Sequence, residues 1–319
     1  CKLCDTRCPA AIDYGTLTKA VRRFVRREGG EGTCTHGGAV QSLTRIMTVP
    51  ELEQDRLGWV DGTLKTKKKG DTVFFVGCTP YFDVLFSETG AQTLEGTKAA
   101  VRLLNAAGVT PVLLPNERCC GHDLLWNGDI ENFTMLAKQN ISMMEAVGAK
   151  RVVVACPEGY TMLKADYPAH LGDLPFEVVH LTEFVADAIE TGDLRFDGGG
   201  ERAVVTYQDP CRLGRHMGIY DAPRKILEAL PGIELVEMPR SRERAVCCGV
   251  GGFQNCTSFS KAIQASRLKE ARSTGADTLV TACPKCEIHL KCAVTDPVLE
   301  EELGLRIVDL AALAAKHLA

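Results

Sequence analysis

Residues 148–163 read GAKRVVVACPEGYTML, and residues 275–290 read GADTLVTACPKCEIHL. In both stretches a glycine–alanine pair precedes a short run rich in β-branched residues, and a cysteine and a proline follow that run. Such a run is typical of a buried strand. Because the two stretches lie roughly 130 residues apart, they predict the internal duplication of a strand that ends at a cysteine.

The duplication extends toward the N-terminus. Residues 71–85 (DTVFFVGCTPYFDVL) correspond to residues 202–216 (RAVVTYQDPCRLGRH), which aligns Cys78 with Cys211. Two pairs of neighbouring cysteines also correspond, and each is followed by a glycine: Cys119-Cys120-Gly121 and Cys247-Cys248-Gly249. Three matched cysteine positions in one register make chance a poor explanation.

Each repeat predicts an alternation of strands and helices. We expect strands at 73–76, 110–114 and 151–155 with helices at 96–107 and 129–147 in the first repeat, and strands at 203–206, 234–237 and 278–282 with helices at 222–230 and 258–273 in the second. This alternation favours parallel sheets whose faces are covered by helices. The cysteines follow strands, and ligands bind at the carboxyl ends of the strands in open α/β sheets.

The predicted fold class is therefore α/β, with two duplicated domains. Their boundaries fall at 71–197 and 200–319, and the glycine-rich, charged residues 197–201 (DGGGE) are the expected joint. Residues 303–319 are expected to form an amphipathic helix.

Composition narrows the function. The 319 residues carry a net charge of −4, which argues against a nucleic-acid surface, and no run approaches the ~18 apolar residues of a membrane helix. Fifteen cysteines are many for this length, yet too dilute for a small secreted disulfide scaffold. Their odd number and clustered spacing favour metal binding in a reducing compartment. We therefore expect a cytoplasmic protein, free or at the periphery of a membrane complex.

The second repeat offers five thiolates. Cys211 is followed after 35 residues by Cys247-Cys248, and after 34 more by Cys283-Pro-Lys-Cys286. Four thiolates suit a tetrahedral zinc ion or an ordinary cubane cluster, but neither has a use for the fifth. Adjacent cysteines also point partly apart, so a cluster of several irons suits them better than one metal ion. A zinc-binding scaffold is the alternative.

The pattern C-x(31–39)-CC-x(33–36)-C-x2-C, together with the stretch DPCRLGR at 209–215, resembles the CCG domain of heterodisulfide reductase B and D subunits and their iron–sulfur relatives. The resemblance extends from about residue 71 to residue 290. It implies a non-cubane four-iron cluster made of two fused two-iron halves. By position, the ligands of that cluster are Cys211, Cys247, Cys248, Cys283 and Cys286.

The first repeat departs from this pattern, because Gly159 stands where the fifth cysteine belongs. Its remaining cysteines are Cys78, Cys119, Cys120 and Cys156. We expect a 4Fe-4S cluster here, while a cubane, a non-cubane cluster with a substitute ligand and an empty site all stay open. The candidates to fill the gap are Cys34, His36, His122 and Glu158. His122 is also placed to donate a hydrogen bond to a cluster sulfur.

The first residues read CKLCDTRCP, which gives the spacing Cys1-x2-Cys4-x3-Cys8-Pro9. This spacing resembles the tail of the bacterial ferredoxin motif C-x2-C-x2-C-x3-C-P. The resemblance implies that these three cysteines hold cubane 4Fe-4S clusters. It also implies that residues 1–70 are the C-terminal part of a ferredoxin-type domain plus a helical linker, and that the sequence is truncated, with another cysteine three residues before Cys1. A ferredoxin module followed by two CCG domains resembles the D-type polypeptide of heterodisulfide reductase.

These expectations favour an electron-transfer subunit of a multi-subunit oxidoreductase, which passes electrons from ferredoxin-type clusters to the clusters of the CCG domains. No G-x-G-x-x-G motif follows a strand, so flavin-, haem- or iron–sulfur-containing partner subunits are expected to supply any such cofactor. The alternative is a catalytic subunit, whose second-domain cluster acts on a disulfide, a thiol or a quinone. Gly159 breaks the equivalence of two clusters on which the disulfide reaction depends in the resembling family.

Other residues near the motifs carry weaker expectations. Arg212, Arg215 and His216 either offset cluster charge, receive an anion or stay solvated. His289 is expected to be an ordinary helix residue, and the cysteines outside the motifs, Cys256 and Cys292, to be buried free thiols in helices.

Overall fold

The computed structural model of the chain describes residues 1–30, 36–197, 199–200, 202–249, 256–296 and 303–318. It contains two sheets, one in each repeat. The first has the order β1-β2-β3, formed by Thr72–Phe75, Arg151–Val154 and Glu177–His180. The second has the order β5-β4-β6-β7, formed by Ile233–Leu235, Ala203–Gln208, Thr278–Thr281 and Arg306–Asp309. All strand pairings among these residues are parallel, which confirms the predicted fold class.

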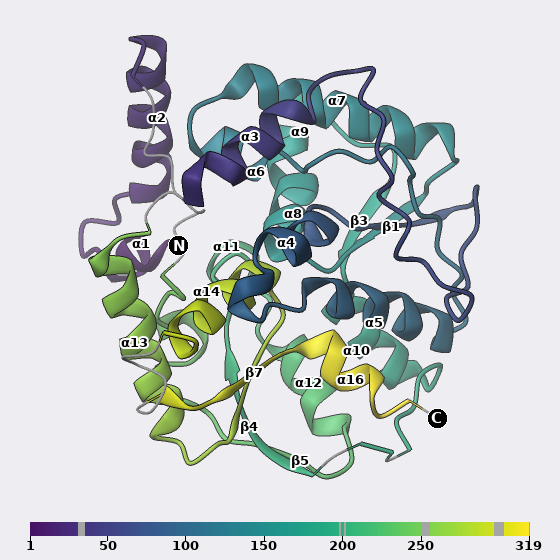
Figure 1. Cartoon of the computed structure of the whole chain (residues 1–319), viewed down its shortest axis with the longest axis vertical. Helices are drawn as coiled ribbons and strands as arrows, with labels where there is room; N and C mark the ends of the chain where they lie inside the picture. The colour runs from purple at the N-terminus through teal and green to yellow at the C-terminus, as the bar shows by residue number, and fades with distance from the viewer. Residues whose placement is uncertain (31–35, 198, 201, 250–255, 297–302, 319) are drawn as a thin grey trace.

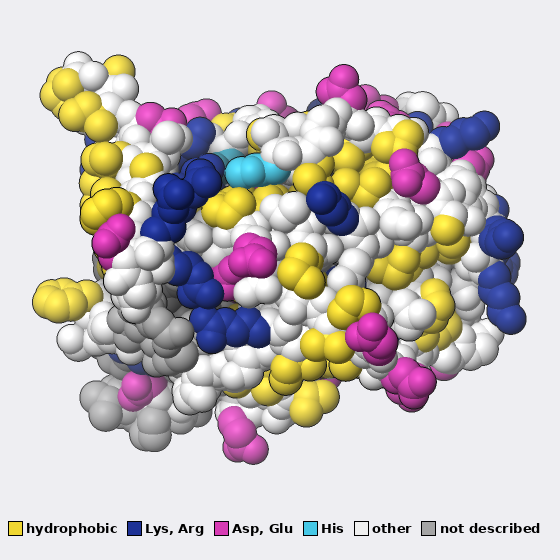
Figure 2. All heavy atoms as spheres, turned by 90° about the horizontal axis from the view of Figure 1, so that it is seen from above, with side chains coloured by type: hydrophobic (Ala, Val, Ile, Leu, Met, Phe, Trp, Pro, Cys, Tyr) yellow, Lys and Arg dark blue, Asp and Glu magenta, His cyan; other side chains and the backbone are white. Residues whose placement is uncertain are grey.

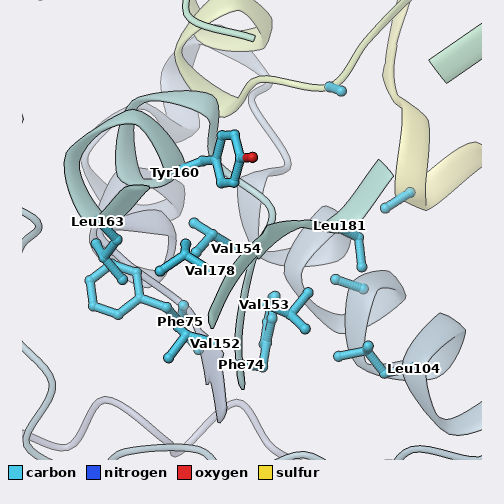
Figure 3. Close-up of a cluster of buried hydrophobic side chains, with 14 of the residues drawn as sticks. Phe74, Phe75, Leu104, Val152, Val153, Val154, Tyr160, Leu163, Val178 and Leu181 are labelled. Carbon is cyan, nitrogen blue, oxygen red and sulfur yellow. The ribbon is translucent and has the colours of Figure 1, made fainter. Parts of the chain in front are cut away.

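The first sheet is buried on both faces (Figure 3). Phe74, Phe75 and the valines of β2 are at most 2% exposed. The helices α7 (Ile130–Ala146) and α9 (Tyr167–Leu171) lie on one side, and α5 (Thr93–Ala106) and α10 (Leu181–Thr191) on the other (Figure 1). Burial on both faces explains why the strand sequences are continuous apolar runs and not alternating ones.

Four helices lie between the two sheets: α5, α10, α12 (Asp221–Ala229) and α16 (Leu310–Ala315) (Figure 1). The last helix of the second repeat, α16, packs against α5 of the first repeat. The last helix of the first repeat, α10, packs against α12 of the second. Each repeat therefore covers part of the other, and one core of buried apolar residues runs through both.

The remaining helices surround the sheets. They are α1 (Leu3–Arg7), α2 (Tyr14–Arg27), α3 (Ala39–Ile46), α4 (Thr79–Leu85), α6 (His122–Trp126), α8 (Pro157–Thr161), α11 (Gly214–Met217), α13 (Ser258–Arg272) and α14 (Pro284–Val294). Short 3-10 turns span His36–Gly38, Ser87–Thr89 and Arg242–Arg244, and a π-helical turn spans Met162–Asp166. Among the described residues, no helix combines the length and the apolar character that a membrane crossing requires.

Two local predictions are wrong. Residues 110–114 form no strand: Val112 makes isolated parallel bridges to Lys67 and Val73. Val112 exchanges backbone hydrogen bonds with Thr72 and Phe74 of β1, whereas Pro111 faces Lys67 on the other side, accepts from its N–H and has no N–H of its own to return. Residues 303–319 are not one helix either, because Arg306–Asp309 pairs with β6 as strand β7 before α16 begins.

The helix α2 projects from the body of the molecule beside α1 (Figure 1). One side of α2 is held by polar contacts, since Arg22 donates to the Trp126 carbonyl at 3.1 Å and Arg26 pairs with Asp129 at 2.6 Å. Its other side carries exposed apolar residues, and Figure 2 shows hydrophobic side chains along this edge of the molecule. They are Tyr14, Leu17, Val21, Phe24 and Val25.

Candidate metal centre

The motif cysteines lie where strands end and helices begin. Cys78 follows β1 and caps α4, Cys156 follows β2 and caps α8, and Cys283 follows β6 and caps α14. Cys211 follows β4, ahead of α11. The helices α4, α8, α11 and α14 meet in the middle of the molecule (Figure 1). The carboxyl edges of both sheets therefore bring their cysteines to one region, as ligand sites in α/β sheets require.

We call the five cysteines of the second repeat site 2: Cys211, Cys247, Cys248, Cys283 and Cys286. The Sγ atoms of Cys248 and Cys286 are 3.2 Å apart, and both residues are buried. A hydrogen bond from the Cys247 thiol lowers the pKa of Cys211 to about 6. Because iron binds thiolates and not thiols, a thiol that ionises this easily is suited to metal binding.

We call the four cysteines of the first repeat site 1: Cys78, Cys119, Cys120 and Cys156. They line a small cavity, together with Gly159. Hydrogen bonds from Cys120 and Cys78 hold the pKa of the Cys119 thiol well below its usual range. A Cβ atom on Gly159 would lie 3.8 Å from the Cβ of Cys156, so a cysteine at 159 would stand directly beside Cys156. The place of the fifth thiol is thus part of the cavity wall.

The glycine after each cysteine pair has a positive φ, +80° at Gly121 and +87° at Gly249. In both repeats its N–H lies 3.4 Å from the Sγ of the first cysteine of the pair, Cys119 or Cys247. A Cβ atom at Gly121 would lie 2.9 Å from the Phe133 side chain of α7, and one at Gly249 would lie 2.7 Å from the Ser260 carbonyl of α13. The glycine is therefore required by its conformation and by a close helix.

Lys285, between the two cysteines of the C-x2-C motif of site 2, reaches across to site 1. Its Nζ lies 2.7 and 2.8 Å from the carboxylate of Asp123 and 2.5 Å from Glu158, and all three side chains are at most 9% exposed. Burial alone would lower the pKa of Lys285, but these two carboxylates outweigh it and hold that pKa well above its usual value. A buried ammonium group therefore lies between the two sites.

His122 belongs to the same buried group. Its Nδ1 lies 2.8 Å from Asp123 Oδ1 and 3.1 Å from Glu158 Oε2. Burial lowers the pKa of His122 well below its usual value, although Glu158 opposes this. Two carboxylates, one lysine and a neutral imidazole thus separate site 1 from site 2.

Aromatic and guanidinium groups also connect the repeats. The guanidinium carbon of Arg212 lies 3.9 Å from the ring centre of Trp126, which ends α6 of the first repeat. Arg215 donates to the Cys1 carbonyl at 2.7 Å and to the Ala245 carbonyl at 2.7 Å. The sequence left three roles open for Arg212 and Arg215: balancing cluster charge, binding an anion or staying solvated. In the structure both side chains contact other parts of the protein.

The N-terminal cysteines lie close to site 2. Cys1 and Cys4 are exposed and line an open hollow of about 800 Å³ whose wall also includes Cys211 and Cys247. Cys8 is half-buried and does not line that hollow.

The comparisons with known proteins agree with this geometry. The family model described as "CCG: Cysteine-rich domain" matches residues 72–164 and 205–291, more than half of the chain. The chain belongs to the CCG cysteine-rich domain family. The two matches contain both cysteine sites and end at residues 164 and 291.

Two relatives of this CCG protein carry names of oxidoreductases. It is 36% identical over 91% of its length to the D subunit of the dihydromethanophenazine:CoB--CoM heterodisulfide reductase of Methanosarcina barkeri, of which it covers 70%. It is 31% identical over 90% of its length to "Probable iron-sulfur-binding oxidoreductase FadF" of Bacillus subtilis, of which it covers 41%. A hypothetical protein from Helicobacter pylori shares the fold alone, with a TM-score of 0.55 and 10% identity over 86% of this chain and 56% of that one.

The donor set of the CCG domains fits an iron–sulfur cluster. All cysteines in the described parts of the chain are free thiols, and five of them converge at site 2. A mononuclear zinc ion takes four ligands, so the fifth thiol favours a cluster of several metal ions.

Some candidate residues lie elsewhere. The ring of His36 packs against Phe86 at 5.3 Å and lies 6.3 Å from that of His289 in α14, and Cys34 lies outside the described residues. Cys256, expected to be buried in a helix, is exposed just before α13, and Cys292 is half-buried in α14.

Sequence patterns did not indicate the roles of Asp123, Trp126 and Lys285. The only signal for Lys285 was its place inside a C-x2-C motif, which says nothing about a partner 162 residues away.

Proposed function

We propose that the chain is an electron-transfer iron–sulfur subunit of an oxidoreductase complex. In this proposal electrons pass from ferredoxin-type 4Fe-4S clusters at the N-terminal cysteines to clusters at the two CCG sites. The observation that carries it is the convergence of three groups of cysteines, since Cys1 and Cys4 share a hollow with Cys211 and Cys247, and Lys285 links site 2 to site 1.

The proposed clusters follow the donor sets. The five thiols of site 2 would hold a non-cubane four-iron cluster, and the four of site 1 a 4Fe-4S cluster. Cys1, Cys4 and Cys8 would contribute to cubane clusters, as part of a ferredoxin-type domain in residues 1–70, followed by CCG domains at 71–197 and 200–319. Clusters of this kind store and pass on single electrons.

The residues around the sites would then tune the clusters. Burial of Cys119, Cys248, Cys283 and Cys286 keeps water away from the metal. The ammonium group of Lys285 places a positive charge between the sites, and a nearby positive charge stabilises the more negative, reduced state of a cluster.

The names of the relatives support this role. The Methanosarcina barkeri and Bacillus subtilis proteins are oxidoreductases, and the former is by name one subunit of several. We infer that this chain also works with partner subunits carrying flavin, haem or iron–sulfur groups, in the cytoplasm or at the periphery of a membrane complex.

A second candidate function is reduction of a disulfide at site 2. It is favoured by the 36% identity to part of an enzyme named for a heterodisulfide. Site 2 alone has the full set of five thiols, so the chemistry of a thiol, disulfide or quinone substrate would belong there.

Metal analysis of the anaerobically purified chain tests the proposal. We expect iron with acid-labile sulfide, and zinc without sulfide would refute it. Cys286→Ala should destroy or convert the cluster of site 2 while iron stays at site 1. Cys292→Ala, in the same helix but outside the motif, is the matched control and should leave both clusters intact.

A redox titration followed by electron paramagnetic resonance distinguishes the sites in these variants. Two indistinguishable signals in the wild-type protein that both disappear in Cys286→Ala would contradict the assignment of separate, unequal sites.

A further inference from the structure

His122 has a buried ring nitrogen that the protein leaves unpaired. The residue is 2% exposed, lines the cavity of site 1 and follows the Cys119-Cys120-Gly121 turn directly. Within the described residues, its Nε2 has no hydrogen-bond partner. Leaving a buried polar atom without a partner is costly, so an unpaired nitrogen at a metal-binding cavity indicates a ligand that the protein atoms do not provide.

The other ring nitrogen fixes which one carries the hydrogen. Nδ1 lies 2.8 Å from Asp123 Oδ1 and 3.1 Å from Glu158 Oε2. Carboxylate oxygens next to a lysine accept hydrogen bonds, so in a neutral imidazole Nδ1 holds the hydrogen and Nε2 has a free lone pair. A histidine that binds a metal through one nitrogen almost always donates the other N–H to a carboxylate or carbonyl.

This tautomer decides between two roles for His122. A hydrogen bond from Nε2 to a cluster sulfur needs a hydrogen on Nε2, and the carboxylates at Nδ1 place it on the other nitrogen. Coordination of iron needs the lone pair, which Nε2 has.

Glu158 and His36 are less suited to be the missing ligand, and Cys34 lies outside the described residues. Glu158 Oε2 lies 3.1 Å from His122 Nδ1 and already pairs with Lys285 at 2.5 Å. The ring of His36 lies beside Phe86 and His289, and neither of these residues lines the cavity of site 1. The position of Gly159 itself carries no side chain and therefore offers no ligand.

We propose that Nε2 of His122 coordinates an iron of the site 1 cluster and takes the place of the fifth cysteine. Asp123 and Glu158 act as positioning residues that orient the ring. This assignment rests on the proposed function, because it requires a cluster at site 1. A neutral imidazole in place of a thiolate leaves the cluster less negative, so site 1 should be reduced at a higher potential than site 2.

Pulsed electron paramagnetic resonance on the full chain, purified anaerobically with its clusters, tests the proposal. Poised where the site 1 cluster is paramagnetic, wild-type protein should show a nitrogen coupling that changes when ¹⁵N-histidine replaces ¹⁴N-histidine. His122→Ala should lose that coupling. The controls His180→Ala, His216→Ala and His289→Ala alter other histidines near the cysteine sites, and all three should keep it.

No histidine coupling in the wild-type protein, or a coupling that survives in His122→Ala, would overturn the assignment. If His122→Ala does not fold, alanine variants of the other six histidines decide by exclusion: loss of the coupling in any of them overturns it, and its retention in all six supports it. Iron and sulfide are measured on the same samples. Their absence refutes the proposed function, whereas clusters without the coupling refute only the role of His122.

Discussion

Replacing Lys285 by methionine should strongly destabilise the protein. The substitution keeps the apolar stem and removes the ammonium group that lies 2.5–2.8 Å from oxygens of Asp123 and Glu158. At an effective dielectric constant near 20, each such pair has a Coulomb energy of about 6 kcal/mol, most of which offsets the cost of burying the charges. Removing one member leaves the other charges buried without compensation, which typically costs about 3–5 kcal/mol.

Urea unfolding under anaerobic conditions, followed by circular dichroism, measures this loss. Arg151→Met is the matched control, because Arg151 pairs with Glu177 at 2.9 Å but both side chains are about half exposed. An exposed pair of this kind contributes about 0–1 kcal/mol. In a double-mutant cycle, Lys285→Met combined with Glu158→Gln should cost less than the sum of the single changes. If Lys285→Met costs no more than Arg151→Met, the buried ion pairs do not hold the two repeats together as described.

Two further predictions concern backbone conformation and pH. Gly249→Ala should cost about 1–2 kcal/mol for its positive φ, plus the clash of its Cβ at 2.7 Å from the Ser260 carbonyl, and should lower the iron content of site 2. Gly275→Ala, with φ +80° and no atom within 4 Å, should show the conformational cost alone in urea unfolding and keep its iron; equal effects of the two changes would contradict this. Burial lowers the pKa of His180 to about 3, so its neutral form contributes stability above pH 6.5 that is lost progressively as the pH falls toward 3. Between pH 7 and pH 5 this loss should be about 2 kcal/mol in urea unfolding, and His180→Asn should remove that part of the pH dependence; an unchanged pH dependence in the variant would be inconsistent with a buried neutral His180.

Much of the fold could be predicted because its signals are local. The apolar runs of β1, β2, β4 and β6 and the cysteine after each of them mark buried parallel strands and their carboxyl ends. The match between the repeats then placed both cysteine sites at sheet edges. Most of the secondary structure of each repeat therefore follows from short segments of its own sequence.

The parts that could not be predicted depend on distant partners. β7 is a strand because β6 offers it an open edge, whereas its sequence, next to the apolar residues of α16, favours a continuous helix. Lys285 is buried because Asp123 and Glu158 of the other repeat receive it, and no pattern around a C-x2-C motif indicates such a pair. The same holds for the stacking of Arg212 on Trp126.

The exchange of helices between the repeats has a consequence for how the protein is made. α16 is synthesised after nearly all of the chain, yet it covers α5 of the first repeat. One face of α5 therefore stays uncovered until the second repeat has been synthesised. The apolar core that runs through both repeats is therefore completed only when the end of the second repeat has been made, so the two repeats depend on each other to finish folding.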